Sequence, residues 1–398
     1  MQTHKKIFFP NLNGVRAIAA FMVIVYHVED IIELFGLPSF PHHDPMGNDL
    51  GGLGVTLFFV LSGFLITYLL LNEKSACGTV SLRDFYIRRV LRIWPLYYLI
   101  VVLAFFVIPP KVLAESFYID FNSKLLLFLF FLPNVAIVAF PSVPFAAQAW
   151  SVGVEEQFYL IWPILIKHYR NLLLILIGIV AIFSVAGVVL FSFSSLLDLG
   201  PTAGNIIKSV GSLVQLTRID CMAIGGIGAY ILFNGKQRVL NILFTRIVQI
   251  ICYAVVIVLI YYRVNFPPFF SHRPYAVLFA ILILNLAANP KTVLSINNRL
   301  FDYLGRISYG LYMYHSMAIF LAVYIITKLF EIKSPTYLNL VVYSASICLT
   351  IAVSAFSYEL FEKFFLKKKI RFSSIISGDN AHPDPQTRAS QPSPEDPP

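Results

Sequence analysis

The most constraining feature of this sequence is a series of apolar segments, most of them long enough to cross a lipid bilayer. Eleven such segments lie at about residues 11–30, 52–73, 91–109, 124–140, 150–167, 171–193, 207–233, 244–262, 274–288, 304–327 and 338–362. Hydrophobic residues make up 58% of the chain and charged residues 13%, whereas soluble domains average nearer half and a quarter. Because about 20 apolar residues span the hydrocarbon core as a helix, the sequence predicts an all-α polytopic membrane protein.

The fourth segment is an exception, because it is short and contains Pro133-Asn134. If the N-terminus lies inside and every other segment crosses, 21 of the 30 basic residues fall on the inner side and seven on the outer side. If the fourth segment also crosses, the inner side receives 12 and the outer side 16. Cytoplasmic loops are enriched in Lys and Arg. We therefore predict ten spanning helices, a broken or re-entrant fourth segment, and cytoplasmic termini.

Nothing outside these segments is long and polar enough to form a second folded domain. We expect residues 1–372 to form one integral-membrane domain, and residues 373–398, rich in Pro, Ser, Asp and Gln, to form a disordered cytoplasmic tail. The net charge of +9 is attributed to loop topology rather than to nucleic-acid binding. The four cysteines lack CxxC spacing, and His42, His43 and Asp44 lack a further spaced ligand, so no metal site is expected.

The first segment carries two costly residues, Arg16 and His27, in an otherwise apolar run. Eleven residues of α-helix turn through about 1100°, only about 20° more than three full turns, so both side chains leave the same face. Their Cα atoms are expected to lie roughly 16 Å apart along the helix axis. One interpretation is a snorkelling arginine and a histidine bonded to a neighbouring helix. The other is a cation and a base aligned along one intramembrane channel.

The second and third segments carry a serine and three arginines. Ser62 precedes Gly63, which permits close approach of another helix; tight packing and a catalytic role are both open for this pair. Arg88, Arg89 and Arg92 lie at the inner membrane edge, the last two on one helix face. They fit either contact with anionic lipid headgroups or a phosphate clamp for a cytoplasmic, nucleotide-bearing cofactor.

The fifth segment opens with two adjacent carboxylates, Glu155 and Glu156, which point about 100° apart and so cannot share one task. Glu155 shares a face with Tyr159, where a carboxylate could orient a histidine or bind a sugar hydroxyl. The structural alternative is a salt bridge to another buried arginine, such as Arg218.

In the seventh segment, Arg218 and Asp220 are two residues apart, so they face different sides and need separate partners. We favour a polar cavity wall for both. The glycines that follow, at 225, 226 and 228, predict very close helix packing.

In the tenth segment, Ser308, Tyr312 and His315 lie on one helical stripe. A role in a site is favoured over simple hydrogen-bonded packing, which remains the alternative. In the last segment, Glu359 is expected to be buried and Glu362 to lie at the interface.

Together these motifs resemble the membrane-bound acyltransferase-3 family from residue 11 to about residue 365, which is nearly the whole chain except the tail. They comprise the arginine and histidine at 16 and 27, Phe-Phe-Val-Leu-Ser-Gly-Phe (58–64), Arg-X-X-Arg (89–92), Trp-Ser-X-X-X-Glu-Glu-Gln-Phe-Tyr (150–159), Arg-X-Asp with following glycines (218–228) and Ser-Tyr-Gly-Leu-Tyr-X-Tyr-His (308–315). Val152 and Gly153 replace the family's commoner leucine and serine, and neither change removes a reactive group.

The resemblance implies transfer of an acyl group, usually acetyl from acetyl-CoA, to a hydroxyl. The acceptors are mostly sugars of surface polysaccharides and lipid-linked glycans, and sometimes small glycosylated metabolites. It also implies that His27 is essential and that Arg89 and Arg92 serve the donor. Acetyl-CoA or another acyl-CoA would be a substrate, with no tightly bound cofactor expected. The expected location is the bacterial cytoplasmic membrane.

The residue chemistry is compatible with this activity. An attacking alcohol must lose its proton, and a neutral histidine suits a general base; alternatively, His27 could carry the acyl group covalently. Arg16, on the inner half of its helix, could bind donor phosphate or polarise the pantetheine amides, with Arg88 at the inner mouth. The acceptor would then enter from the outside, towards which His27 lies.

Two other classes of function compete with this interpretation. A transporter or flippase for an anionic or glycosylated substrate would share the broken segment and the intramembrane charges. It does not explain a triple-arginine inner mouth aligned with a single histidine channel, and we find no inverted repeat. A non-catalytic receptor or scaffold has little reason to hold several buried ionisable residues. The identity of the acceptor is not specified by the sequence.

Overall fold

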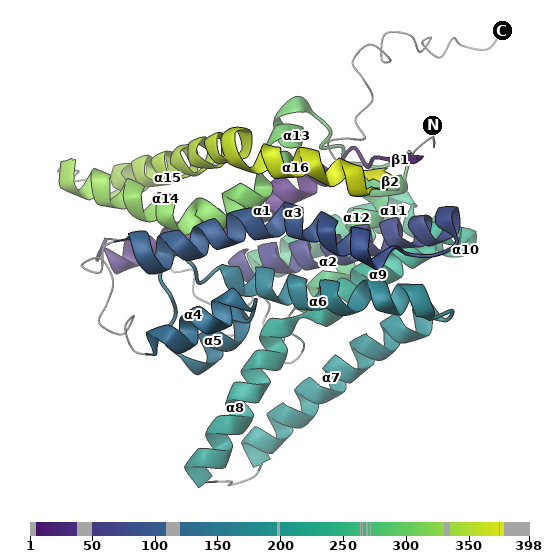
Figure 1. The fold of residues 1–398 in the computed structure, drawn as a ribbon, viewed down its shortest axis with the longest axis horizontal. Helices are drawn as coiled ribbons and strands as arrows, with labels where there is room; N and C mark the ends of the chain where they lie inside the picture. Colours follow the sequence, from purple (N-terminus) through teal and green to yellow (C-terminus); the bar gives the residue numbers. More distant parts are fainter. Residues whose placement is uncertain are drawn as a thin grey trace.

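The computed structural model describes residues 5–37, 50–108, 120–196, 200–262, 264, 266–267, 270, 272–329, 335–373 and 375–377. It is a bundle of helices with one pair of short strands (Figure 1). The helices are α1 (Leu12–Leu34), α2 (Leu50–Cys77), α3 (Leu82–Val102), α4 (Phe121–Leu129), α5 (Pro133–Ala139), α6 (Ala149–His168), α7 (Leu172–Leu196), α8 (Gly200–Thr217), α9 (Ile219–Phe233), α10 (Gln237–Leu243), α11 (Arg246–Tyr261), α12 (Arg273–Ala288), α13 (Arg299–Arg306), α14 (Ser308–Leu329), α15 (Pro335–Ser357) and α16 (Lys363–Lys369). The predicted all-α polytopic class is therefore confirmed. The predicted outer-loop histidines and the tail beyond residue 377 lie outside the described residues.

Several of these helices are long and apolar enough to cross a bilayer. Among the described residues there are six, or seven if α10 and α11, bent by 58° to one another, form one span. The six are Leu50–Cys77, Leu82–Val107, Leu172–Leu190, Gly204–Phe233, Ser308–Leu329 and Tyr337–Phe372. Helices α1 and α6 are not among them, and both carry the ionisable residues that make a span costly. The count of ten spans and the cytoplasmic location of the termini stay predictions.

The fourth apolar segment is broken, as predicted. Helices α4 and α5 are separated by a turn in which Phe131 adopts a left-handed conformation, and Pro133 begins α5. Two backbone carbonyls at the break accept hydrogen bonds from protein side chains: Tyr97 Oη donates to the Phe128 oxygen (2.7 Å) and Gln157 Nε2 to the Phe131 oxygen (3.1 Å). Irregular backbone at membrane depth needs such internal partners. Side chains of α3 and α6 therefore stabilise the break.

The seventh segment is interrupted at Arg218, which the sequence did not indicate. Arg218 has φ 38° and separates α8 from α9. Figure 1 shows α7 and α8 projecting together away from the other helices. A non-glycine residue in this left-handed region is strained and is retained only where its surroundings fix it.

The last apolar segment contains a register shift that corrects one expectation. Residues 358–362 form a π-helical turn between α15 and α16. The side chain of Glu359 is 47% exposed and pairs with Lys363, whereas Glu362 is only 7% exposed and accepts a hydrogen bond from Ser357. The prediction that Glu359 is buried and Glu362 interfacial was therefore wrong, because a π-turn inserts an extra residue and rotates the face that follows.

Helix α2 lies inside the bundle, where it contacts α1, α6, α9 and α12. Its approach to α9 is very close: a Cβ added at Gly63 would lie 1.9 Å from the Met222 oxygen, and one at Gly225 would lie 2.0 Å from the Val60 oxygen. Only glycine tolerates such contacts, as small residues do at membrane helix interfaces. The predicted close packing is confirmed at Gly225 and at Gly226, where an added Cβ would lie 2.9 Å from Leu176 Cδ2, but at Gly228 the nearest atom is 3.7 Å away.

The two ends of the described chain lie side by side (Figure 1). Strand β1 (Lys5–Ile7) pairs in parallel with β2 (Ile375–Ser377), with Lys6 opposite Ile376. The segment that follows α16 is thereby held against the N-terminus.

Replacing Gly63 by alanine is expected to destabilise the bundle by about 1–3 kcal/mol, because the added methyl group forces the α2 and α9 backbones apart. The apparent midpoint of thermal unfolding of the detergent-solubilised protein measures this. The matched control is Gly178→Ala in α7, where nothing lies within 4 Å of the added Cβ. Equal midpoints for the two variants would contradict the packing argument.

Candidate functional site

A cavity of about 380 Å³ lies among α1, α2, α3, α6, α13, α14 and α16. Eight of the thirteen predicted site residues line it: Arg16, Ser62, Arg89, Arg92, Glu155, Tyr159, Ser308 and Tyr312. The other five, His27, Arg88, Arg218, Asp220 and His315, do not. The structure thus brings most of the motifs into one chamber, although they come from distant parts of the sequence.

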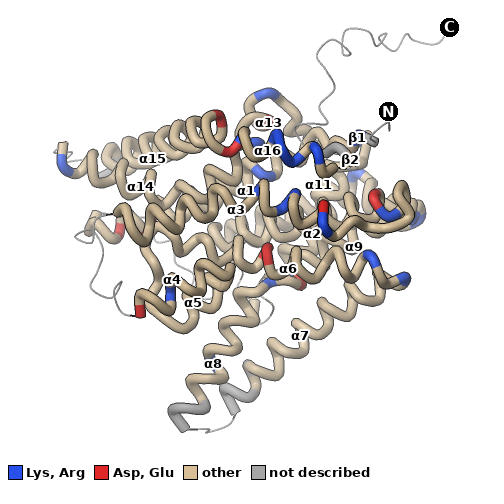
Figure 2. Tube along the Cα trace, in the orientation of Figure 1, with Lys and Arg blue, Asp and Glu red and all other residues tan. Residues whose placement is uncertain are grey.

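The cavity wall is strongly basic. Its lining residues include seven cations, Arg16, Arg89, Arg92, Arg306, Lys363, Lys367 and Lys369, and one carboxylate, Glu155. Figure 2 shows a concentration of Lys and Arg, in blue, along α16 and the neighbouring part of the bundle. A cleft of one charge sign with low-dielectric walls concentrates ligands of the opposite sign, so the electrostatics of this chamber favour anions over cations.

Arg16 is fixed by a polar chain across the chamber. Its Nη1 donates to Asn13 Oδ1 (2.7 Å), and Asn13 Nδ2 donates to Asp302 Oδ1 (2.7 Å). Asp302 also pairs with Arg306 (3.1 Å). The first helix and α13 are therefore joined by shared hydrogen bonds, with a guanidinium at each end facing the cavity.

Glu155 is held inside the cavity wall by two hydroxyl groups. Ser62 Oγ donates to its Oε1 (2.7 Å), and Tyr159 Oη donates to its Oε2 (3.1 Å). The Arg89 guanidinium lies over the Tyr159 ring, 5.4 Å from its centroid. Arg218 donates instead to the Gly52 oxygen, so the alternative of an ion pair with Glu155 is not seen among the described residues. No described hydrogen bond joins Glu155 to a histidine, and its catalytic role stays a prediction.

The neighbouring charged residues have separate tasks. Glu156 accepts a hydrogen bond from Trp94 Nε1 (3.2 Å), so the two adjacent carboxylates do face different partners. Arg88 pairs with the buried Glu73 (2.8 Å) and donates to the Phe372 oxygen (2.6 Å). Arg88 thus ties α3 to α2 and to the segment after α16, whereas Arg89 and Arg92 reach the cavity.

His27 and His315 pack against each other beside the cavity. Their ring centroids are 4.7 Å apart, edge to face. His27 is partly buried, and its Nδ1 lies 2.8 Å from the Val23 oxygen. Because a carbonyl only accepts, we assign the proton to Nδ1, which leaves Nε2 of the neutral ring as the basic nitrogen. His315 is fully buried and makes the same kind of bond to the Tyr312 oxygen.

Tyr312 connects the cavity to this histidine pair. It lines the cavity, its hydroxyl lies 2.7 Å from Ser151 Oγ, and its ring centroid lies 5.8 Å from that of His315. Sequence reasoning missed Gln148, which accepts from Ser316 Oγ (3.2 Å) through its side chain and from Tyr312 Oη (3.0 Å) through its main chain. The available signal in the sequence was a glutamine two residues before Trp150.

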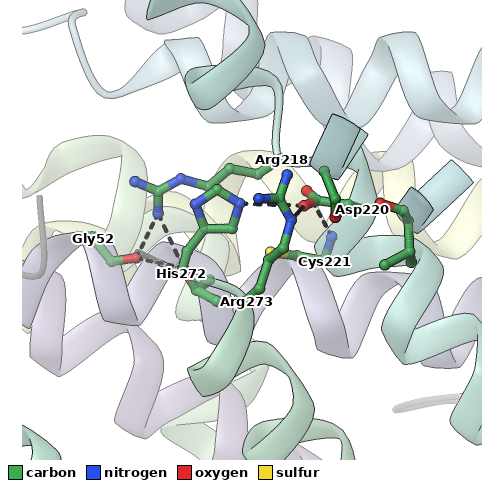
Figure 3. A network of polar contacts seen from close by, with 9 residues as sticks. Gly52, Arg218, Asp220, Cys221, His272 and Arg273 are labelled. Carbon is green, nitrogen blue, oxygen red and sulfur yellow. Dashed lines mark hydrogen bonds and ion pairs between the residues drawn. The ribbon is translucent and has the colours of Figure 1, made fainter. Parts of the chain in front are cut away.

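Arg218 and Asp220 belong to a separate network (Figure 3). Asp220 pairs with Arg273 Nε (2.6 Å) and lies 3.4 Å from His272 Nε2. Arg218 points the other way and donates to Gly52 and Thr56 of α2. Their separate partners confirm the prediction from spacing, and the network joins α9 to the start of α12.

Three potential metal ligands meet in this network. One ligand atom each of Asp220, Cys221 and His272 lies within 4.8 Å of the others. The Arg273 guanidinium already neutralises the Asp220 carboxylate, however, and would repel a metal cation placed there. The arrangement fits an ion-pair network better than a metal centre.

Comparison with known proteins identifies relatives over almost all of the chain. The family model for the acyltransferase-3 group, described as an acyltransferase domain, matches residues 9–359. A protein of Staphylococcus aureus (strain COL), provisionally named an O-acetyltransferase, is 27% identical over 396 residues, covering 92% of this chain and 59% of the relative. No solved structure matches the chain.

Two further relatives carry names that mention a polymer. A Bacillus subtilis protein, provisionally named a peptidoglycan O-acetyltransferase, is 24% identical over 388 residues, covering 91% of this chain and 55% of the relative. The peptidoglycan O-acetyltransferase of Listeria monocytogenes is 32% identical over 195 residues, covering 44% of this chain and 28% of the relative. The chain therefore spans little more than half the length of the curated relatives that it matches along most of its length.

The cavity should admit a small anionic reagent to Ser62. In a background without the two exposed cysteines, Cys77→Ser and Cys348→Ser, we expect Ser62→Cys to react with an anionic methanethiosulfonate at least about 10-fold faster than Ser346→Cys, because the basic wall attracts the reagent. Ser346 is fully buried and does not line the cavity. Thiol labelling of the solubilised protein, followed by mass spectrometry, measures both rates. Equally slow labelling would show that the chamber is closed.

Proposed function

Because the chain belongs to the acyltransferase-3 family, we propose that it is a membrane O-acyltransferase. It moves an acyl group, most simply acetyl, from acyl-CoA to a hydroxyl of a glycan such as peptidoglycan or a lipid-linked sugar. The observation that carries this proposal is the basic cavity whose wall, at Tyr312, adjoins the His27–His315 pair. We place the protein in the bacterial cytoplasmic membrane, with the basic mouth towards the cytosolic pool of acyl-CoA.

The donor site is assigned to the cation-lined chamber. Acyl-CoA carries several phosphate charges at one end and the thioester at the other, so it requires a basic mouth and a longer, less charged passage. Arg89 and Arg92 lie on one face of α3 and line the chamber, and guanidinium groups match phosphate oxygens well. Arg89 Nε is buried without a hydrogen-bond partner among the described residues, which fits a site completed by an anionic ligand.

His27 is assigned as the base at the far end of the passage. In a direct transfer, the acceptor hydroxyl gives its proton to His27 Nε2 while its oxygen attacks the thioester carbonyl carbon. The carbon–sulfur bond then breaks, and the departing thiolate takes the proton from the imidazolium. In a two-step route, His27 Nε2 attacks the carbonyl carbon first, and the carbon–sulfur bond breaks to release the thiolate and leave an acyl-imidazolium. The acceptor oxygen then attacks the acyl carbon, the carbon–nitrogen bond breaks to restore the neutral ring, and the hydroxyl proton passes to the thiolate. Both routes use the nitrogen that the Val23 hydrogen bond leaves unprotonated.

The acceptor is proposed to be a glycan. The relatives' names refer to peptidoglycan for two longer proteins, and we extend a glycan acceptor to this chain as a hypothesis. A hydroxyl of the acceptor has to approach His27 from the side opposite to the basic mouth. Glu155, Ser62 and Tyr159 are polar enough to contact either substrate at the cavity wall.

Replacing His27 by alanine is expected to lower acyl transfer by at least about 100-fold, because the step loses its proton acceptor or acyl carrier. The assay follows radiolabelled acetyl groups from acetyl-CoA to an isolated glycan acceptor, using purified full-length protein. His168→Ala, which alters an exposed histidine at the end of α6, is the matched control. Full transfer by the His27 variant would refute the assignment. Label that crosses proteoliposomes without becoming fixed would indicate a transporter.

Substitution of Arg89 or Arg92 should affect donor binding, whereas substitution of Arg88 should affect stability. Arg89→Gln and Arg92→Gln are expected to raise KM for acetyl-CoA by about 10-fold or more, because each loses a charge-assisted contact with the donor. Arg88→Gln should instead lower the midpoint of thermal unfolding, because it leaves the buried Glu73 without its partner. Steady-state kinetics and thermal unfolding on the three variants distinguish the roles. If KM for acetyl-CoA rose only in Arg88→Gln, the roles assigned to these arginines would be wrong.

A further inference from the structure

The C-terminal helix contributes three lysines to the cavity. Lys363, Lys367 and Lys369 of α16 line the chamber together with Arg89 and Arg92 of α3. Lys368 does not line it; its Nζ lies over the Phe364 ring, 4.0 Å from the centroid. Sequence reasoning treated these lysines only as part of the positive-inside pattern, so their place in the wall of the chamber is a new element of the site.

The position of α16 is fixed by three features of the fold. The π-helical turn at residues 358–362 sets the direction of the helix. Arg88 Nη1 donates to the Phe372 oxygen (2.6 Å) just beyond it. Strand β2 then pairs with β1 at the N-terminus. These contacts fix α16 in position, so three of its lysines face the chamber. A lysine-rich segment that only anchored the chain at the membrane surface would not need such fixed positions.

The cations of the chamber lie at different depths. Arg89 is half-buried, and its guanidinium lies over the Tyr159 ring. Lys367, in contrast, is an exposed residue of the chamber lining. The thioester end of a donor has to reach the histidines, so the opposite end has to remain near the exposed cations.

We infer that α16 is a phosphate-binding element, in which Lys367 and Lys369 bind the phosphate monoester on the ribose of a coenzyme A-type donor. Arg89 and Arg92 then take the diphosphate, which lies nearer the thioester. This inference rests on the proposed acyl-CoA-dependent function and adds to it a second anion subsite. Lysine ammonium groups act on phosphate as mobile point charges, which suits a terminal phosphate at a partly exposed rim.

The test compares two ligands that differ only in that phosphate. Equilibrium binding of coenzyme A and of 3′-dephospho-coenzyme A is measured with purified full-length protein in an uncharged detergent. The wild-type protein is expected to bind coenzyme A about 10-fold more tightly than the dephospho form, a difference of about 1.4 kcal/mol. The double variant Lys367→Gln/Lys369→Gln should lose this preference and keep its affinity for the dephospho form within about two-fold.

Two control variants separate this role from charge or folding effects. Lys368→Gln removes one positive charge from the same helix but none from the chamber, so it should keep the wild-type preference. The double variant Lys367→Arg/Lys369→Arg should keep most of the preference for coenzyme A, because arginine supplies the same positive charges. Unchanged thermal unfolding of all variants verifies that they are folded.

The outcomes that overturn the inference are distinct from failure of the proposed function. If the double variant still prefers coenzyme A, α16 does not bind the monoester, although acyl transfer stands. If the effect appears only when anionic lipid vesicles are present, the lysines bind lipid headgroups and the inference is wrong. If the wild-type protein neither binds coenzyme A nor transfers from acetyl-CoA, the proposed donor itself is wrong and the inference falls with it.

Discussion

Ionisable side chains are expensive inside an apolar helix bundle, and the arrangement of this protein follows from where each of them finds a partner or a polar cavity. Asp220 is neutralised by Arg273, and Glu73 by Arg88. Glu155 is bonded by two hydroxyl groups. One chamber is lined by seven cations and a single carboxylate, so basic side chains predominate there. The same constraint therefore stabilises the bundle and gathers basic side chains around one chamber.

The chamber depends on packing that lies outside it. The contact of α2 with α9, where glycines meet backbone carbonyls, sets α2 close to the centre of the bundle. From there, α2 presents Ser62 to Glu155 of α6 on the neighbouring face of Gly63. Catalytic and structural uses of the Ser-Gly pair, which look like alternatives in the sequence, are thus compatible: one residue faces the cavity and the next faces α9.

Local sequence rules predicted the local outcomes well. The proline-containing fourth segment breaks where expected, and residues spaced two apart in the seventh segment face different partners. Helical spacing also placed Ser308 and Tyr312 on one face, which lines the cavity. It failed at Glu359 and Glu362, because the π-helical turn changes the periodicity on which the argument depends. No local feature of the sequence predicted the π-helical turn.

The sequence by itself determined the class of the fold, the family resemblance and half of the polar residues that line the chamber, because apolar length, helical period and motif order are local properties. Only the tertiary structure decided which arginine faces inwards, since Arg88 and Arg89 are chemically identical neighbours distinguished by Glu73 on another helix. It also decided that lysines some 270 residues away from the α3 arginines share their cavity. Helical periodicity fixes which residues share a face, but long-range packing fixes which faces meet.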